Sequence, residues 1–429
     1  RNVSATICRL GGWQHNAARV LPEKQRIDDR VAELFVPVIL IISLLTFFIW
    51  VFFGGIDVVS HGLFAALSVL VVACPCVVGL ATPVALAAGL NKAARNHILI
   101  RDTSALEQMR NVDVVVFDKT GTLTEGHPTV IGWLWAQGQE EHYKDVLLAA
   151  ESTSDHPLAE AIVTALEGEE QVIPAHLDGF ESIAGKGVRV AYQGAEYWVG
   201  SHKLLKDYQA NLSDILADML TQYESDGNSI VYFGRENDLL AVIAIKDQLR
   251  VTSMEAIREL RIQDIEICML TGDGERTASS VAGSLGIMRF VADAMPDDKE
   301  DFIHKLQLQG KTVAMVGDGV NDARALSCAD VSIAMGKGTD TLMDTAMITL
   351  RTSDLLLLPK VFRLSRQTVS LMYRNLFWAF IYNTVGIFVA AGVLYPVYDI
   401  LLSPALAGAA MALSCVSVAL SSLRLSSRF

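Results

Sequence analysis

Four long apolar segments without a charged residue constrain this chain more than any other feature of its sequence. They cover residues 35–53, 62–90, 376–398 and 400–423. Each is about as long as, or longer than, the ~20 residues that an α-helix needs to cross the hydrocarbon core of a bilayer. The sequence therefore predicts four transmembrane helices and a lipid bilayer as partner. The alternative is a set of buried helices in a large soluble protein.

The spacing of these segments predicts the topology. Residues 91–375 separate the second segment from the third, whereas the other two connections are too short to hold a domain. Basic residues flank the long connection and follow the last segment: Lys92, Arg95, Arg101, Arg363, Arg366, Arg374, Arg424 and Arg428. Because Lys and Arg are enriched on the cytoplasmic side, we expect a multi-pass protein of the cell membrane (plasma or inner) whose large part is cytoplasmic. The net charge of −13 argues against a nucleic-acid partner.

The cysteines and the chain start carry less information. Six cysteines are scattered along the chain, which does not favour a disulfide framework: Cys8, Cys74, Cys76, Cys268, Cys328 and Cys415. The chain opens on Arg1 without an initiator Met or a signal-peptide pattern. We therefore expect it to be part of a longer polypeptide.

Apolar runs that end in turn residues indicate a parallel sheet wrapped by helices in the cytoplasmic part. The runs cover residues 112–117, 240–245, 265–270, 312–316 and 331–334. Polar residues follow several of them, and the carboxyl ends of parallel strands are where α/β proteins place their chemistry.

These polar residues suit phosphoryl transfer. Asp118 supplies an attacking oxygen, and Asp318 and Asp322 are hard oxygen ligands of the kind that Mg²⁺ takes. Lys299 can neutralise charge on the transferred group, and Thr271 can donate hydrogen bonds to it. Asp118-Lys-Thr alone is a weak signal. The four motifs around Asp118, Thr271, Lys299 and Asp318, occurring in this order along the chain, are far more specific.

The residue two positions after Asp118 distinguishes two classes of protein. A hydrolytic phosphatase would place a second carboxylate there as general acid and base, but this chain has Thr120. Water activation is then weak, so we expect an aspartyl phosphate to persist as an energy-coupling intermediate.

Residues 126–239 form an insertion with its own hairpin and helix patterns. Gly185 and Gly187 would let a planar base or a phosphate approach the backbone, and Glu151 and His156 could contact adenine. In an arbitrary sequence a His-Pro pair such as His156-Pro157 is more often a simple turn.

Cys74-Pro75-Cys76 lies in the middle of the second apolar segment. Pro75 removes a backbone hydrogen bond and opens the helix, so both sulfurs could face one site. Further candidate ligands lie in the last two segments: Tyr382, Asn383, Met411, Ser414 and Cys415. Sulfur ligands without a charged residue nearby favour Cu(I). Taken singly, Met411 is more often a packing residue, and Tyr382 and Asn383 are more often interhelical hydrogen-bonding residues.

Together these motifs resemble a P-type ATPase of the heavy-metal branch, most similar to the copper(I)-exporting members. The matching motifs are Cys74-Pro75-Cys76, Asp118-Lys-Thr-Gly-Thr122, His156-Pro157, Gly185-x-Gly187, Thr271-Gly-Asp273, Gly317-Asp-Gly-x-Asn-Asp322, Tyr382-Asn383 and Met411-x-x-Ser414. The resemblance implies ATP, Mg²⁺ and transported Cu(I), delivered by a copper chaperone, with Lys119 and Asp273 among the catalytic residues.

The resemblance also implies a multidomain fold. It joins the four transmembrane helices to an α/β haloacid-dehalogenase-like (Rossmannoid) phosphorylation domain with an inserted α+β nucleotide-binding domain. The expected divisions are a linker (1–33), helices one and two (34–90), the phosphorylation domain (91–125 and 240–355), the nucleotide-binding domain (126–239) and helices three and four (356–429).

This chain departs from the family pattern in two ways. Cys415 and Arg324 stand where relatives usually have Ser and Pro, and we hypothesise that Cys415 adds a third thiol to the membrane site. No Thr-Gly-Glu actuator motif and no Cys-x-x-Cys domain is present, so we expect an actuator segment of the same polypeptide as a partner. This segment alone is then expected to bind nucleotide without efficient turnover. Export of Ag(I), Zn(II) or Cd(II), and a membrane-anchored phosphatase or metal sensor, remain alternatives.

Overall fold

A computed structural model describes residues 23–54, 59–74, 76–136, 140–154, 156–169, 172–183, 185–210, 214–318, 322–336, 346–398 and 400–427. The chain divides into two compact units. The helical unit comprises Arg1–Asn96, Asp102–Arg110 and Val361–Phe429, and the sheet unit comprises His97–Arg101 and Asn111–Lys360.

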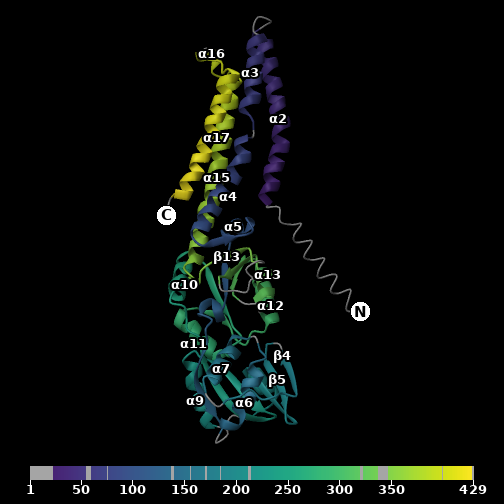
Figure 1. Ribbon diagram of the computed structural model, residues 1–429. Helices are drawn as coiled ribbons and strands as arrows, with labels where there is room; N and C mark the ends of the chain where they lie inside the picture. The colour runs from purple at the N-terminus through teal and green to yellow at the C-terminus, as the bar shows by residue number, and fades with distance from the viewer. Residues whose placement is uncertain are drawn as a thin grey trace, which may run out of the picture. The chain divides into compact units, whose positions relative to one another are not determined.

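A seven-stranded sheet forms the first layer of the sheet unit (Figure 1). Its order is β1 (Ile98–Ile100), β13 (Ile348–Leu350), β12 (Val331–Met335), β11 (Val313–Gly317), β2 (Val114–Asp118), β9 (Glu266–Leu270) and β10 (Arg289–Val291). All neighbours are parallel except β1 and β13. The residues of β2, β11 and β12 are all buried, which explains their continuous apolar sequences.

Three helices of the sheet unit follow strands β9, β10 and β11 of this sheet in the chain: α11 (Glu275–Leu285), α12 (Pro296–Leu308) and α13 (Ala323–Cys328). A fourth helix, α10 (Ser253–Ile262), precedes β9. Ile303 and Leu306 of α12 and Leu326 of α13 share one core cluster with β2, β9 and β11. This packing fixes where the polar residues at the start of each helix lie.

The inserted segment forms a second, antiparallel sheet. Its order is β3 (Thr129–Trp135), β8 (Asp238–Lys246), β7 (Ser229–Arg235), β6 (Ala195–Gly200), β5 (Gly187–Tyr192) and β4 (Gly179–Ile183). Helices α6 (Glu140–Glu151) and α7 (Pro157–Glu167) share a core cluster with one face. Helices α8 (His202–Asp207) and α9 (Asp214–Ser225) share a second cluster with the other.

One strand prediction was wrong. Residues 240–245 were expected in the parallel sheet, but they lie in β8, which pairs antiparallel with β3 and β7. Seven consecutive residues of β8 are buried because helices cover both faces of this sheet. That burial produces the continuous apolar run that is otherwise typical of a parallel strand. The antiparallel sheet therefore includes residues up to Lys246.

The helical unit contains α2 (Glu23–Gly54), α3 (Val59–Val72), α4 (Cys76–Arg95), α5 (Ser104–Met109), α15 (Leu357–Ala390), α16 (Tyr395–Tyr398) and α17 (Pro404–Ser427). Hydroxyl and indole groups bond backbone carbonyls of neighbouring segments. The Ser43 Oγ donates to Ala66 O at 2.9 Å, and the Ser68 Oγ donates to Leu402 O at 2.7 Å. The Trp50 Nε1 donates to Ala391 O at 3.0 Å.

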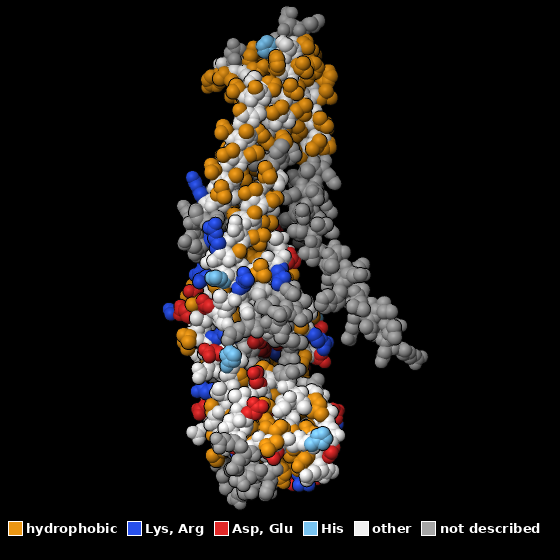
Figure 2. Space-filling model, viewed as in Figure 1, with side chains coloured by type: hydrophobic (Ala, Val, Ile, Leu, Met, Phe, Trp, Pro, Cys, Tyr) orange, Lys and Arg blue, Asp and Glu red, His pale blue; other side chains and the backbone are white. Residues whose placement is uncertain are grey.

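Apolar side chains are numerous on the visible surface of the helical unit (Figure 2). Phe52 is 83% exposed and Phe53 is 82% exposed, a surface that suits lipid far better than water. By length and composition, two of the described helices could cross a membrane, Phe35–Phe53 and Pro404–Arg424, and Val59–Val72 is a shorter apolar helix.

The prediction of four transmembrane helices is thus only partly supported. The second apolar segment is not one helix, because α3 ends at Val72 and α4 begins at Cys76. Pro75, which has no N–H to donate, lies between them in the sequence. The third segment is the last part of α15, whose first part carries basic residues.

Two glycines of the antiparallel sheet offer a matched test of its backbone. A Cβ on Gly187, at φ +143°, would lie 2.1 Å from the Val199 carbonyl oxygen, whereas nothing lies within 4 Å of one on Gly194, at φ +78°. We expect Gly187→Ala to lower the thermal unfolding midpoint clearly, since strained backbone costs about 1–3 kcal/mol before the clash is added. Gly194→Ala should cost only about 1–2 kcal/mol. Equal midpoints for the two variants would contradict this packing.

Candidate functional site

Three neighbouring strands bring the polar residues of the seven-stranded sheet to one edge. Asp118 is the last residue of β2, and Thr271 and Asp318 directly follow β9 and β11. Because β2 pairs in parallel with both β9 and β11, these three residues lie at the same carboxyl edge. The Asp118 side chain remains slightly accessible, with 7% of the residue exposed.

Lys299 of α12 lies between two of the carboxylates. Its Nζ is 2.6 Å from Asp118 Oδ1 and 2.7 Å from Asp322 Oδ1. Burial would lower the pKa of the Lys299 ammonium, but the charges of Asp118 and Asp322 outweigh burial and raise that pKa. The ammonium is therefore held charged beside the candidate nucleophile.

The carboxylates of Asp118, Asp318 and Asp322 fit a Mg²⁺ ion. One oxygen from each lies within 4.8 Å of the others. With Lys299, their formal charges sum to −2, which one divalent ion balances, and hard carboxylate oxygens are what Mg²⁺ prefers. Burial, with a contribution from the Asp118 charge, raises the pKa of Asp318 and that of Asp322 to about 7. Lys299 balances only one of the three carboxylate charges, and a metal ion would balance the rest.

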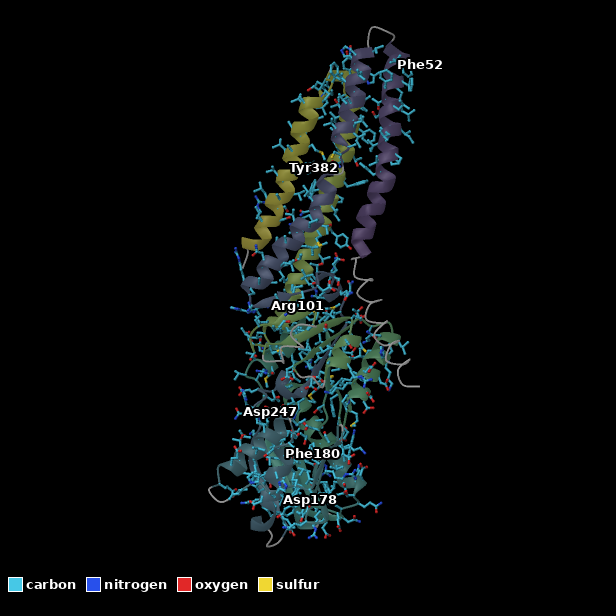
Figure 3. The ribbon with its side chains drawn as sticks, turned by 45° about the vertical axis from the view of Figure 1, so that its right-hand side comes forward. Phe52, Arg101, Asp178, Phe180, Asp247 and Tyr382 are labelled. Atoms are coloured by element: carbon cyan, nitrogen blue, oxygen red, sulfur yellow. The ribbon has the colours of Figure 1, made fainter. Side chains whose placement is uncertain are left out.

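The turn after Asp118 leaves room for the Asp318 carboxylate. Gly121 has φ +72°, and a Cβ there would lie 1.5 Å from Asp318 Oδ2. Buried Arg250 donates to the carbonyl oxygen of Thr122 at 2.9 Å and also to that of Gly121. The Asp247 carboxylate, labelled in Figure 3, accepts from Thr124 Oγ1 at 2.5 Å and from Gly126 N at 3.1 Å.

Arg250 and Asp247 were missed by the sequence analysis. Both follow β8, which that analysis placed in the wrong sheet. A charged residue after a strand is ordinary in any sequence, so only the three-dimensional contact with residues 121–126 reveals that they position the turn.

Lys119 and Asp273 form a second buried pair at this edge. The Lys119 Nζ contacts Asp273 Oδ2 and donates to Ser229 Oγ at 3.0 Å. Burial would raise the pKa of the Asp273 carboxyl, but the Lys119 charge outweighs burial and the pKa is lowered. Buried Thr271 accepts from the Asp273 N–H through its Oγ1 at 3.1 Å, and Thr120 is half-buried in the turn after Asp118.

The residues predicted to bind nucleotide lie in two places in the inserted segment, one between α6 and α7 and the other between β4 and β5. Glu151 ends α6 and is buried, and burial raises its pKa to about 7. His156 begins α7, with its Nδ1 accepting from Leu158 N at 3.2 Å, so His156-Pro157 opens a helix rather than forming a simple turn. The imidazole Nε2 then carries the proton and can donate to a ligand.

Gly185 and Gly187 frame the connection between β4 and β5, both with positive φ. At Gly187 the close partner is the backbone of β6, so this glycine is explained by strand packing as well as by ligand approach. Ser201 donates its N–H to Lys186 O in the same connection, at 2.8 Å. Its buried hydroxyl has no hydrogen-bond partner among the described residues, so it too is available to a ligand.

The predicted membrane ligands are only partly brought together. Met411 and Cys415 of α17 pack against a cluster that contains Ala81 of α4 and Ala379 of α15. Ser414 lies beside them with a buried hydroxyl that has no partner in the described part of the chain. Asn383 of α15 is buried, at 4% exposed.

Tyr382 and the cysteine pair lie differently. Tyr382 (Figure 3) is 47% exposed, and its ring stacks on Trp378 at 5.8 Å, so the structure does not place it with the buried group. Cys74 is half-buried just beyond α3. The Cys76 side chain lies outside the described residues.

The family model of the haloacid dehalogenase-like hydrolases matches the sequence over residues 112–330, which is half of the chain. This chain belongs to that family. The range includes the strand that ends in Asp118, the antiparallel insertion and the residues up to Asp330, so the hydrolase fold and the site described above coincide.

Comparison with known proteins confirms the resemblance to heavy-metal P-type ATPases. The chain is 42% identical over 419 residues to a copper-exporting P-type ATPase of Legionella pneumophila, covering 98% of this chain and 57% of the relative. It is 44% identical over 424 residues to a silver exporting P-type ATPase of Salmonella typhimurium, covering 98% and 51%. The crystal structure of a zinc-transporting PIB-type ATPase in the E2.Pi state has 32% identity and a TM-score of 0.66, covering 92% of this chain and 63% of that one. The chain thus spans about half the length of the curated relatives it matches.

The raised carboxyl pKa values predict how this hydrolase-family site responds to pH. Asp318 and Asp322 are partly protonated near pH 7, and Mg²⁺ needs them deprotonated, so its affinity should rise with pH. We expect calorimetric titration between pH 8 and pH 6 to show a loss of up to about tenfold per pH unit for each proton displaced. Asp318→Asn should bind more weakly at pH 8 and show a smaller pH dependence. An affinity that is the same at pH 6 and pH 8 would be incompatible with this assignment.

Proposed function

We propose that this chain is the catalytic and membrane-spanning part of an ATP-driven exporter of Cu(I) that works through a phosphate on Asp118. The contact of Lys299 with both Asp118 and Asp322, at the edge where Asp318 also lies, is the observation that carries the proposal. It joins a nucleophile, a fixed cation and a hard-metal ligand set in one buried place.

The residues act on the terminal phosphoryl group of ATP. An Asp118 oxygen attacks the γ-phosphorus, the bond to the leaving oxygen breaks, and ADP departs with that electron pair. Asp318 and Asp322 would hold Mg²⁺, which would supply positive charge to the phosphoryl oxygens. Lys299 and Thr271 stabilise the transferred group, while Asp273 keeps Lys119 in place. Thr120 supplies no general base, so the acyl phosphate persists until another segment positions water.

The antiparallel sheet supplies the nucleotide site in this proposal. Glu151, His156, Gly185 and Gly187 surround the adenine end of ATP, with Ser201 as a further donor. The phosphorylation domain then comprises residues 91–125 and 247–355, and the nucleotide-binding domain comprises residues 126–246. The corrected pairing of β8 supports this division.

The membrane proposal depends on sulfur chemistry. Four apolar segments cross the bilayer, the sheet unit is cytoplasmic, and the reduced pair Cys74 and Cys76 binds Cu(I) with help from Met411, Ser414 and Cys415. Asn383 and Tyr382 are candidate ligands on α15, and a copper chaperone delivers the ion. The copper-exporting relatives support this assignment. The silver exporting relative favours Ag(I) as the second candidate, because Ag(I) is an equally soft ion.

Phosphorylation by labelled ATP tests the nucleophile. We expect the lipid-reconstituted chain to take up the γ-phosphate with Mg²⁺ present, in a form stable to acid and labile to hydroxylamine, as an acyl phosphate is. Asp118→Asn should remove the label, whereas Asp247→Asn should retain it, since Asp247 only holds the turn. Label that survives in Asp118→Asn would end the proposal.

The same assay decides the metal. Cu(I) or Ag(I) under reducing conditions should raise the labelling of Asp118, and Zn(II) should not, because the membrane segments offer sulfur and no carboxylate. Stimulation by Zn(II) alone would replace Cu(I) with a divalent cargo while leaving the Asp118 intermediate intact.

Cys415 provides a test of the membrane ligands. Its side chain packs beside Met411 towards α4 and α15. We therefore expect Cys415→Ser to weaken Cu(I) binding by about tenfold or more, because loss of even an outer-shell partner typically lowers metal affinity by that factor. The matched control is Cys268→Ser, a buried free thiol in β9 of the sheet unit. Unchanged Cu(I) stoichiometry and affinity in Cys415→Ser would show that Cys415 only packs.

A further inference from the structure

A group of metal-binding side chains lies outside the site described above. Glu300 and His304 of α12 and Cys328 at the end of α13 each offer a ligand atom, and the three atoms lie within 4.8 Å of one another. Helices α12 and α13 pack side by side (Figure 1). The proposed function uses none of these three residues.

The distances between these atoms suit a tetrahedral ion. Cys328 Sγ lies 3.5 Å from Glu300 Oε1, and His304 Nε2 lies 3.9 Å from the same oxygen. Ligand atoms around tetrahedral Zn²⁺ are about 3.4–3.6 Å apart, given its bond lengths to sulfur, nitrogen and oxygen. A closure of about half an ångström at His304, estimated from those bond lengths, would complete the geometry.

Gln307 orients two of the three ligands. Its Oε1 lies 3.2 Å from His304 Nδ1, and its Nε2 donates to the Cys328 carbonyl oxygen at 2.9 Å. Because Gln307 Oε1 can only accept, His304 Nδ1 carries the proton and the lone pair of Nε2 faces Glu300. This arrangement, with the imidazole fixed through its other nitrogen, is what protein metal sites use to aim a histidine.

Arg324 occupies the remaining side of the group. Its NH2 lies 3.0 Å from Glu300 Oε2, and its NH1 contacts Asp297. Glu300 thus uses one oxygen for Arg324 and leaves Oε1 to the other two ligands. Arg324 partly neutralises Glu300, and it is the residue that departs from the usual Pro of similar sequences.

We propose that Glu300, His304 and Cys328 form a binding site for a borderline divalent cation of the Zn²⁺ type, with water as the fourth ligand. Thiolate, imidazole and carboxylate together are a zinc ligand set, whereas Cu(I) favours sulfur alone and Mg²⁺ favours oxygen alone. The side chains of Glu300 and His304 are 27% and 52% exposed, so the ion can exchange with solution. On binding, the Cys328 thiol proton passes to solvent.

The position of this site gives the cation a structural role. Glu300 directly follows Lys299, and α13, which Cys328 ends, begins directly after Asp322. An ion shared by Glu300, His304 and Cys328 therefore fixes α12 to α13 and, with them, Lys299 to Asp322. The site is independent of which ion the membrane segments carry.

Cobalt absorption tests the proposal directly, because Co²⁺ bound to a thiolate shows a charge-transfer band in the near ultraviolet. The parent for the test is the full chain with Cys8, Cys74, Cys76 and Cys415 changed to Ser, in excess Mg²⁺ to fill the carboxylate site. We expect this parent to bind one Co²⁺ with the thiolate band, and Zn²⁺ to displace it. Cys328→Ser should abolish the band, whereas Cys268→Ala, at the other remaining cysteine, should retain it.

Two further variants test residues that contact the proposed ligands but do not themselves bind the ion. Gln307→Ala should keep the band but weaken Co²⁺ binding about tenfold, the usual effect of losing an orienting partner. Arg324→Ala should strengthen binding several-fold, because it removes the charge that competes for Glu300. A parent without the band, or a band that persists in Cys328→Ser, would overturn the proposal.

Discussion

A buried ammonium group between two carboxylates is the interaction on which the site depends. Lys299 contacts Asp118 on β2 and Asp322 at the start of α13, so one side chain joins the central strand to two helices. Without it, Asp118, Asp318 and Asp322 would be like charges crowded in a poorly solvated place. Removing one partner from such a pair typically costs about 3–5 kcal/mol, so the same contact that sets the chemistry also holds the local fold.

This edge of the sheet could be predicted from the sequence because its pattern is local. Each of β2, β9 and β11 is a short apolar run followed directly by polar residues, and parallel pairing brings these ends together. The prediction that residues 240–245 belong to the parallel sheet was wrong for a physical reason. Burial on both faces gives an antiparallel strand the continuous apolar sequence of a parallel one. Arg250 and Asp247 could not be found at all, because their role exists only in contacts with the turn far away in sequence.

In the helical unit the sequence predicts the apolar segments but not how their side chains pack. Hydropathy marks the apolar segments clearly, but it does not report the interruption between Val72 and Cys76 or which side chains face inward. Met411 and Cys415 pack towards neighbouring helices, whereas Tyr382 stacks on Trp378 at the surface of the unit. The spacing of residues along one helix indicates which of them share a face. Which of them can share an ion depends on the neighbouring helices that pack against that face.

The hydrogen bond from Lys119 to Ser229 has a consequence for how the two sheets communicate. Ser229 begins β7 of the antiparallel sheet, while Lys119 directly follows Asp118 and pairs with Asp273. A hydrogen bond to a charged group is worth about 1.5–3 kcal/mol, enough to change an equilibrium tenfold or more. A displacement of β7 therefore changes the field around Asp118 without any contact with it. The position of the Lys119 charge near Asp118 therefore depends on the position of β7 in the antiparallel sheet.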